Sequence, residues 1–492
     1  MQNLPGDIYS VASVREIDRS AIEDHGIPGY TLMTRAGAAA VRAARERFPD
    51  TQRWQVIAGA GNNAGDGYVV ARLAAADGIA VSVLALVESA ALTGDAATAC
   101  ADFAAEGGLV FPWSGELDAE ADLLIDAILG SGLGRDVDGD FAAAVAAINA
   151  HPAVVLALDI PTGIDGNSGA ILGCAVKADL TTTFVALQAG LFLGEASNHC
   201  GEITFSGLDI PDDCRAGVIP ELRRIDDDLV GHNLPPRRRA AHKGDFGHVL
   251  VVGGGPGMPG AAQLCGMAAL RAGAGRVSIA TDTAHAAAIA AARPELMVHG
   301  VDGAAALEAL LERVDVIAFG PGLGQSAWAQ ELYDVLVADG RPAVWDADAL
   351  NLLAGQPAVA EHRIVTPHAG EAAALLGLTA AEIQADRTAA LQALASKYGG
   401  VTVLKGAGTL ICSASGAPLL CSSGNPGMAA PGMGDVLTGV IAALLAQGLG
   451  AAMAAAVGVE VHARAGDRAA LAGQRGMIAT DLLDELRAAV NP

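Results

Sequence analysis

Short apolar runs that each end in a glycine-rich or polar turn recur along the whole chain, and they constrain its fold more than any other feature. Strands that alternate with helices form a parallel sheet with helices on both faces, so the pattern predicts an α/β fold. In the first half we expect strands at 54–58, 81–86, 122–126, 154–158, 180–185 and 202–205. In the second half we expect strands at 248–252, 276–280, 314–319, 342–345, 363–365, 401–404 and 408–412, with helices over 260–273, 326–338, 380–396, 436–446, 451–466 and 480–489.

Two complete cycles of strands indicate two domains, since 492 residues are too many for one hydrophobic core. A polar, proline-containing stretch separates the cycles. We therefore predict two three-layer α/β/α domains, residues 1–225 and 240–492, joined by a linker at 226–239.

Charge and composition exclude several classes of protein. The 55 acidic residues outnumber 30 basic ones, giving a net charge of −25, which argues against binding nucleic acid. The apolar stretch 436–459 is interrupted at Gln447-Gly-Leu-Gly450, which favours two buried helices over a membrane span. Seven cysteines without a C-x-x-C pair, and no secretion signal, predict a cytoplasmic protein with reduced thiols.

A glycine-rich run from Gly424 to Gly439 holds one acid, Asp435, and opens into an apolar stretch. Glycines let backbone amides approach an anion, and a helix that begins near Gly434 directs its positive end to the same place. A carboxylate beside such a turn can activate a hydroxyl for attack on phosphate. The alternative interpretation is a helix that Asp435 caps.

Four further turns of the second half also follow apolar strands, and they start at Gly320, Asp346, Pro367 and Lys405. In open α/β sheets, ligands bind beyond the carboxyl ends of strands, so these turns are expected to face one crevice. Two of the four lysines, Lys243 and Lys405, lie in glycine-rich turns, where an ammonium suits a point contact to phosphate. A histidine such as His368 is equally explained as a turn residue with local hydrogen bonds.

The first half repeats this arrangement. The turn Gly59–Gly67 follows one strand, and Asp159–Gly163 follows another. Between them, Asp126 ends a strand that runs into Gly130–Arg135. The segment 59–64 loosely matches a dinucleotide fingerprint, but no acid closely follows the next strand, which disfavours a simple dehydrogenase. Asp126 and Asp159 could equally cap the turns that follow them.

With Lys243–His248 and Gly257–Ala262, the motifs of residues 240–490 resemble the ADP-dependent NAD(P)H-hydrate dehydratase family, which has a ribokinase-like fold. The resemblance implies Asp435 as catalytic base, Mg²⁺, and ADP as phosphoryl donor. It implies hydrate contacts at Ala262, Gly322, His368 and Asp435, and nucleotide contacts at Lys405, Gly406, Ala407, Gly408, Thr409 and Gly434. Ala430 and Pro431 depart from the family pattern, and Pro431 removes one backbone donor.

Residues 10–220 resemble the NAD(P)H-hydrate epimerase family, with a Rossmann-like fold. The resemblance implies Asp159 as an acid/base group and K⁺ bound by Asn63, Asp126 and Thr162, which supply hard oxygen ligands. It implies substrate contacts at Asn62, Asn63, Ala64, Gly65, Asp66, Gly130, Ser131, Gly132, Leu133, Gly134, Arg135, Asp136 and Asp159.

The two halves in this order resemble the bifunctional NAD(P)H-hydrate repair enzymes. The resemblance implies NAD(P)H hydrate and ADP as ligands, a homo-oligomer, epimerisation of the (R) and (S) hydrates, and dehydration of the (S) form. A ribokinase-like kinase for a small alcohol, fused to a nucleotide-binding module, is the alternative. A non-enzymatic adaptor is disfavoured, since it has no need for polar side chains at converging strand ends.

Overall fold

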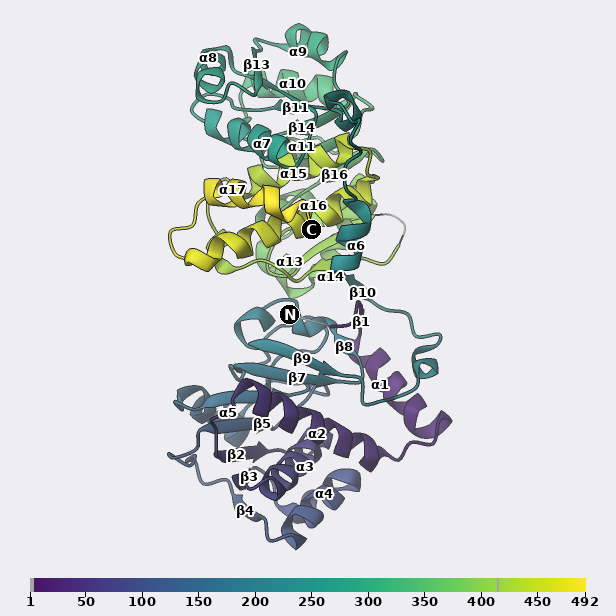
Figure 1. The fold of residues 1–492 in the computed structure, drawn as a ribbon, viewed down its shortest axis with the longest axis vertical. Coiled ribbons are helices and arrows are strands. Elements are labelled where there is room, and N and C mark those ends of the chain that lie inside the picture. The colour runs from purple at the N-terminus through teal and green to yellow at the C-terminus, as the bar shows by residue number, and fades with distance from the viewer. Residues whose placement is uncertain (1–3, 414–415) are drawn as a thin grey trace. The chain divides into compact units, whose positions relative to one another are not determined.

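The computed structural model describes residues 4–413 and 416–492, and the chain divides into two compact units, Met1–Leu222 and Arg223–Pro492 (Figure 1). The boundary falls three residues before the expected one. The expected linker, 226–239, contains helix α6 (Asp227–Asn233), which belongs to the second unit and forms an ion pair between Asp227 and Arg464 of 2.6 Å. The segment is therefore packed structure for part of its length.

The first unit is built on a seven-stranded parallel sheet of order β4-β3-β2-β5-β6-β7-β9. Its strands are β2 (Arg53–Ala58), β3 (Ala80–Ala85), β4 (Leu109–Pro112), β5 (Leu123–Ala127), β6 (Val154–Leu158), β7 (Leu180–Phe184) and β9 (Glu202–Ser206). Two short strands, β1 (Asp7–Tyr9) and β8 (Leu187–Gln188), pair with each other in parallel. Strands β1, β4 and β8, which are short or largely exposed, were not predicted.

Helices cover both faces of this sheet because successive strand residues point to opposite sides. Val56 and Ile125 pack with α2 (Gly29–Arg47), α3 (Asn62–Ala76) and α4 (Gly94–Ala105). Ile57 and Leu124 pack on the other face with α5 (Gly139–Ala150). Helix α1 (Val11–Arg19) begins at Ser10, whose hydroxyl accepts a hydrogen bond from the Ser13 amide.

The second unit has the parallel order β13-β12-β11-β14-β15-β16-β17, followed by antiparallel β18 and β19. The strands are β11 (His248–Val252), β12 (Arg276–Thr281), β13 (Met297–Gly300), β14 (Val316–Phe319), β15 (Ala343–Trp345), β16 (Arg363–Val365), β17 (Val401–Leu404), β18 (Thr409–Ser413) and β19 (Leu419–Cys421). Arg223 and Arg224 of β10 (Leu222–Arg224) pair with β19. Strands β10, β13 and β19 were not predicted.

The core of the second unit lies between the sheet and four helices, α7 (Pro259–Arg271), α15 (Met433–Ala446), α16 (Ala451–Ala469) and α17 (Ala479–Ala489). The opposite face carries α10 (Ala327–Val337), whose Tyr333 packs edge-on against Trp345 with ring centroids 5.6 Å apart. The remaining helices are α8 (Thr283–Ala292), α9 (Ala304–Leu311), α11 (Asp348–Gly355), α12 (Ala369–Leu376), α13 (Ala380–Ala385) and α14 (Arg387–Tyr398). The single helix expected over 380–396 is thus two helices, and the Asp386 side chain caps the second.

Helix α15 positions the second site. From Val436 to Leu444 every residue is buried, as expected for a helix that is apolar on all sides. Gly439 permits its close approach to α7, because a Cβ there would lie 2.1 Å from the Cys265 carbonyl oxygen. Helices α15 and α16 are separated at 447–450, as predicted, and among the described helices there is none with the length and apolarity to cross a membrane.

Candidate functional sites

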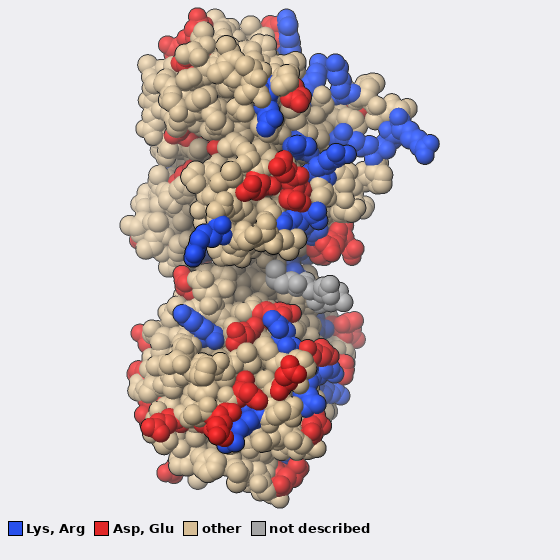
Figure 2. Space-filling model, turned by 60° about the vertical axis from the view of Figure 1, so that its left-hand side comes forward, with Lys and Arg blue, Asp and Glu red and all other residues tan. Residues whose placement is uncertain are grey.

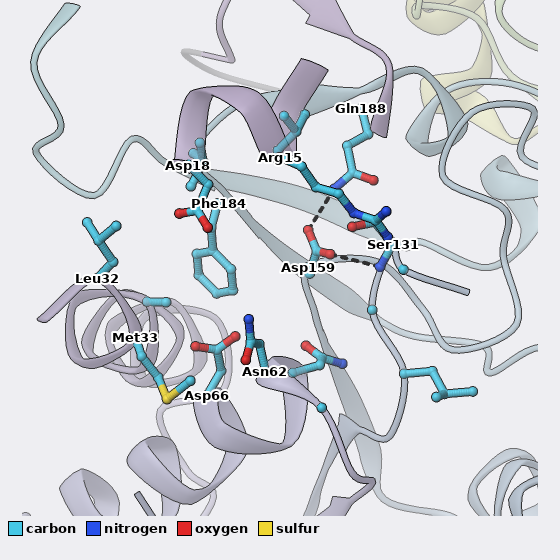
Figure 3. A pocket seen from close by; sticks show the side chains of 18 of the residues that line it. Arg15, Asp18, Leu32, Met33, Asn62, Asp66, Ser131, Asp159, Phe184 and Gln188 are labelled. Carbon is cyan, nitrogen blue, oxygen red and sulfur yellow. Dashed lines mark hydrogen bonds between the residues drawn. The ribbon is translucent and has the colours of Figure 1, made fainter. Parts of the chain in front are cut away.

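The first unit holds a cavity of about 730 Å³ at the carboxyl ends of its strands (Figure 3). Polar groups reach it from the start of α3, from the turn after β5 and from the end of β6. Of the predicted substrate contacts, the cavity is lined by Asn62, Asn63, Asp66, Gly130, Ser131, Gly132, Leu133, Gly134, Arg135 and Asp159. Ala64, Gly65 and Asp136 do not line it, and Gly65 packs instead against Met33.

Asp159 is fixed at the wall of this cavity. Its Oδ2 accepts a hydrogen bond of 3.0 Å from the Ser131 amide, and its Oδ1 accepts one of 2.8 Å from Nε2 of Gln188. Burial raises the pKa of Asp159, while these donors oppose the shift. The carboxylate therefore caps the Ser131 turn, as the capping interpretation expects. It also lines the cavity, where its acid/base role stays a prediction.

Strained backbone gathers around the same cavity. Asp159, Val185 and Leu208 have φ of 65°, 67° and 54°, and all three line it. A positive φ is unfavourable for residues other than glycine, and especially for β-branched valine. Such strain costs about 1–3 kcal/mol per residue and is concentrated at functional sites.

Two further carboxyl groups face Asp159, namely Asp18 of α1 and Asp66 of α3. Burial and the neighbouring charge of Asp159 raise the pKa of both, and the pKa of Asp66 lies well above its ordinary value. Phe184 closes the space between them (Figure 3). Asp18, Phe184 and Gln188 gave no recognisable signal in the sequence, because only the fold brings them to the cavity.

Asp126 and Thr162 lie behind the cavity wall and are fully buried. The Thr162 hydroxyl donates to Oδ1 of Asp126 at 2.7 Å, and the Thr162 amide donates to Oδ2 at 2.8 Å. Burial raises the pKa of Asp126 to about 6. Asn63 is also buried, and neither its amide nitrogen nor its amide oxygen has a hydrogen-bond partner among the residues that the structure describes.

In the second unit, the first turn of α15 carries Asp435, with Gly432 as its N-terminal cap at φ 89°. Burial raises the pKa of Asp435 to about 7, and the nearby charge of Asp346 adds to the shift. Buried His462 lies 2.9 Å from the Met433 carbonyl oxygen through Nε2. Since a carbonyl only accepts, this ring nitrogen must be the donor, and burial lowers the pKa of His462 to about 4.

Lys405 lies in the middle of an acidic group beside Gly434. Its Nζ is 2.6 Å from Oδ1 of Asp346 and 3.6 Å from Oε2 of Glu371. A Cβ at Gly434 would lie 3.5 Å from this Nζ, so the pair directly adjoins the start of α15. In this arrangement the ammonium is engaged by carboxylates, and a contact with phosphate stays a prediction.

Asp346 is held in place by two side chains, Lys405 and Thr438. Burial opposes its charge, but Lys405 and the Thr438 hydroxyl, which donates to Oδ2 at 2.9 Å, together hold the pKa of Asp346 below its usual range. Ala347, which lies between Asp346 and Asp348, has a strained backbone with a φ of 49°. The sequence singled out this turn but assigned no role to either aspartate.

The other predicted contacts of the second unit have distinct positions. His368 caps α12, and its Nδ1 accepts hydrogen bonds from the amides of Gly370 and Glu371, as expected of a turn residue with local hydrogen bonds. Ala262 is fully buried in α7, and Gly322, with φ 59°, packs against Met258. Residues 405–408 form the turn between β17 and β18, and Thr409 begins β18. The carbonyl groups of Leu404 and Gly408 accept hydrogen bonds from the buried guanidinium of Arg387.

Together these features define two α/β enzyme units, one with a cavity of carboxyl and amide groups and one with a glycine-rich turn and a carboxylate at the start of a buried helix. Family models agree with this division. Residues 249–488 match the model described as NAD(P)H-hydrate dehydratase, and residues 29–190 match the model described as YjeF-related protein N-terminus.

Similar proteins span the whole chain. The bifunctional NAD(P)H-hydrate repair enzyme Nnr of Coxiella burnetii is 45% identical over 486 residues, which is 99% of each chain. The Escherichia coli K12 enzyme of the same name is 42% identical and covers 100% of this chain and 95% of its own. The chain therefore belongs to the family of bifunctional NAD(P)H-hydrate repair enzymes.

Solved structures match the second unit. A ribokinase-like superfamily protein from Enterococcus faecalis V583 has 30% identity and a TM-score of 0.52, covering 56% of this chain and 96% of its own. The ADP/ATP-dependent NAD(P)H-hydrate dehydratase from Bacillus subtilis, crystallised with ATP/Mg²⁺, has 30% identity and a TM-score of 0.50, covering 54% and 96%. These matches confirm the ribokinase-like fold and favour the dehydratase over the kinase alternative.

Proposed function

We propose that this chain repairs hydrated NADH and NADPH, the second unit dehydrating the (S) hydrate and the first interconverting the (R) and (S) hydrates. The observation that carries the proposal is the position of Asp435, a carboxyl group with a pKa of about 7 in the first turn of α15, beside the Gly432–Gly434 amides. A base with a pKa near the working pH is well matched to taking a proton from a hydroxyl group.

The dehydration proceeds in two stages. Asp435 takes the proton of the C6 hydroxyl as its oxygen attacks the terminal phosphoryl group of ADP, which leaves AMP. The C6–O bond then breaks and inorganic phosphate departs, while loss of a C5 proton forms the ring double bond of NAD(P)H. The amides at the start of α15 stabilise negative charge on the transferred group.

The nucleotide lies, in this proposal, against the turn Lys405–Thr409 and Gly434, while the hydrate lies near Ala262, Gly322, His368 and Asp435. Magnesium would be held chiefly by the nucleotide phosphates, as is usual for this ion. Both oxygens of Asp346 are engaged by Lys405 and Thr438, so this carboxylate is a structural anchor rather than a magnesium ligand.

Potassium fits the first unit. Within the described part of the chain, Asn63 offers a buried amide oxygen with no hydrogen-bond partner. It lies beside the Gly130 turn, where a Cβ at Gly130 would lie 3.5 Å from the Asn63 Cγ. Thr162 is tied to the same turn by a 3.0 Å hydrogen bond from the Leu129 amide. Asn63, Asp126 and Thr162 would hold K⁺ through oxygen atoms, and the ion would stabilise the turn that contacts the substrate.

Epimerisation is assigned to Asp159, whose carboxyl group faces the cavity and can act as general acid and then as general base. Its proton lets the C6 hydroxyl leave as water, with the ring nitrogen lone pair stabilising C6; water then adds to the other face of C6 and returns a proton to Asp159. We further propose a cytoplasmic homo-oligomer that does not bind nucleic acid or membranes, which the net charge of −25 supports. Acidic and basic side chains are both present on the face seen in Figure 2.

Incubation of the protein with mixed NADH hydrates, ADP and Mg²⁺ tests the proposal. We expect the absorbance of reduced nicotinamide to return, with release of AMP and phosphate. A stable phosphorylated product without recovery of NADH would instead support a kinase.

A further inference from the structure

Arg15 of α1 is a cation at the first cavity to which neither the sequence nor the resemblance assigns a role. Among the described residues that line this cavity, the permanent positive charges are Arg15 and Arg135, against four aspartates, Asp18, Asp66, Asp95 and Asp159. Arg135 forms an exposed ion pair with Asp138 of 3.2 Å. Within the described residues Arg15 has no hydrogen-bond or ion-pair partner, so its charge is available to a ligand.

The guanidinium of Arg15 lies against the turn after β5. Figure 3 shows its side chain extending from α1 toward Ser131, and a Cβ at Gly132 would lie 3.1 Å from one of its terminal nitrogens. The glycine therefore leaves room for the guanidinium beside the backbone of the turn. Gly132 and Gly134 are exposed, and within the described part of the chain their amides make no hydrogen bond.

An arginine side chain beside a turn whose amides have no hydrogen-bond partner is suited to bind phosphate. The reason is that a guanidinium can donate two parallel hydrogen bonds to phosphate oxygens. A positive charge is needed at this cavity, because a dinucleotide hydrate brings a negatively charged diphosphate to a site lined with aspartates. The net charge of the chain, −25, adds to the repulsion.

We propose that Arg15 binds the diphosphate of the dinucleotide substrate at the first site, together with the Gly132 and Gly134 amides. This inference rests on the proposed epimerase function of that unit. Arg15 is a substrate-binding residue in it and takes no part in moving the proton.

The test uses the full chain with Arg15→Gln, Arg15→Lys and Arg19→Gln. Arg19 is the matched control, because it lies on the same helix but pairs with Glu16 and Glu23 outside the cavity. The rate of (R) hydrate conversion is measured as a function of concentration for both NADH and NADPH hydrates, and the rate on the (S) hydrate serves as an internal control for the second unit.

We expect Arg15→Gln to raise KM for the (R) hydrate at least about 10-fold, the scale of a lost charge-assisted hydrogen bond, equally for NADH and NADPH hydrates and with a smaller change in kcat. Arg15→Lys should be intermediate, and Arg19→Gln should resemble the parent. The KM of the parent should also rise more steeply with salt than that of Arg15→Gln.

Equal KM values for Arg15→Gln and Arg19→Gln would overturn the assignment. A rise in KM confined to NADPH hydrate would also overturn it, because it would place Arg15 at the 2′-phosphate. A loss of kcat alone would also contradict it. If the parent chain itself fails to accelerate conversion of the (R) hydrate, the proposed epimerase function fails, an outcome that is separate from these.

Discussion

The Nζ of Lys405 lies 2.6 Å from Oδ1 of Asp346, and both groups adjoin Gly434, the residue before Asp435. Lys405 keeps the carboxylate of Asp346 ionised and balances its charge, whereas the pKa of neighbouring Asp435 is raised to about 7. Environments that separate the pKa values of neighbouring carboxyl groups are typical of sites where one group must exchange a proton and the other must not.

The first prediction concerns the pH dependence of dehydration. Asp435 must be ionised to accept a proton, so kcat/KM for the (S) hydrate should rise with pH and level off above about pH 7, where the free enzyme loses that proton. Initial rates between about pH 5.5 and 8.5 test this, with stability checked at each pH. A flat profile in this range would remove Asp435 as the base.

Replacing Asp435 by Asn should lower the dehydration rate about 10²- to 10⁴-fold while nucleotide binding persists, because the amide keeps the shape but cannot take a proton. The same change should stabilise the fold. A raised pKa means that the folded state holds a proton that the unfolded state releases, so Asp435 costs stability as pH rises from about 4 to 7.

Asp435→Asn should therefore be the more stable protein at pH 8 by about 1–4 kcal/mol and should differ little from the parent near pH 4. Denaturant unfolding at both pH values measures this difference. Near parental turnover in the variant would contradict the catalytic role, whatever its stability.

Lys405→Met should destabilise the second unit by about 3–5 kcal/mol, since it leaves the buried carboxylate of Asp346 without its partner. Lys243→Met is the control, because Lys243 also lies in a glycine-rich turn but is exposed, and its loss should change the free energy of unfolding by less than about 0.5 kcal/mol. Adding Asp346→Asn to Lys405→Met should recover part of the loss; equal stability of the two single lysine variants would refute the anchor role.

Asp126→Ala should leave the rate on the (S) hydrate unchanged and slow consumption of the (R) hydrate to its spontaneous rate. The reason is that Asp126 holds Thr162 and, with Asn63, supplies the proposed potassium ligands beside the substrate turn. A time course on mixed hydrates, resolved by chromatography with and without K⁺, measures both rates. Rapid loss of both hydrates in the variant would argue against the division of labour.

The units should also fold and act separately. Each has its own sheet and its own core, so residues 1–222 and 223–492, expressed alone, should unfold cooperatively and retain the epimerase and dehydratase activities respectively. A second fragment that starts at 240 lacks α6 and its Asp227–Arg464 ion pair, so it should be less stable than one that starts at 223. Thermal unfolding of the three fragments makes the comparison, and insoluble 1–222 and 223–492 fragments would show that the boundary is wrong.

The sequence by itself determined the α/β class, nearly all of the central strands, and the turns that bear Asp159 and Asp435. Apolar strands that end in glycine or aspartate are local signals, and they can be read without knowing what packs against them. Strands such as β4 and β13 were not predicted, because edge strands are short and mostly exposed. Helices α13 and α14 were predicted as one helix, because the cap at Asp386 lies inside a helical pattern.

Only the tertiary structure decided which groups meet. Arg15 and Asp18 reach the first cavity from a helix more than 100 residues before Asp159, and Lys405 meets Asp346 across 59 positions. It also decided the electrostatics. Burial and the charge of Asp346 raise the pKa of Asp435, whereas at Asp346 the charge of Lys405 and the hydroxyl hydrogen bonds outweigh burial and lower the pKa. Desolvation and charge pairing depend on what surrounds a group in space, and a linear pattern of residues does not contain that information.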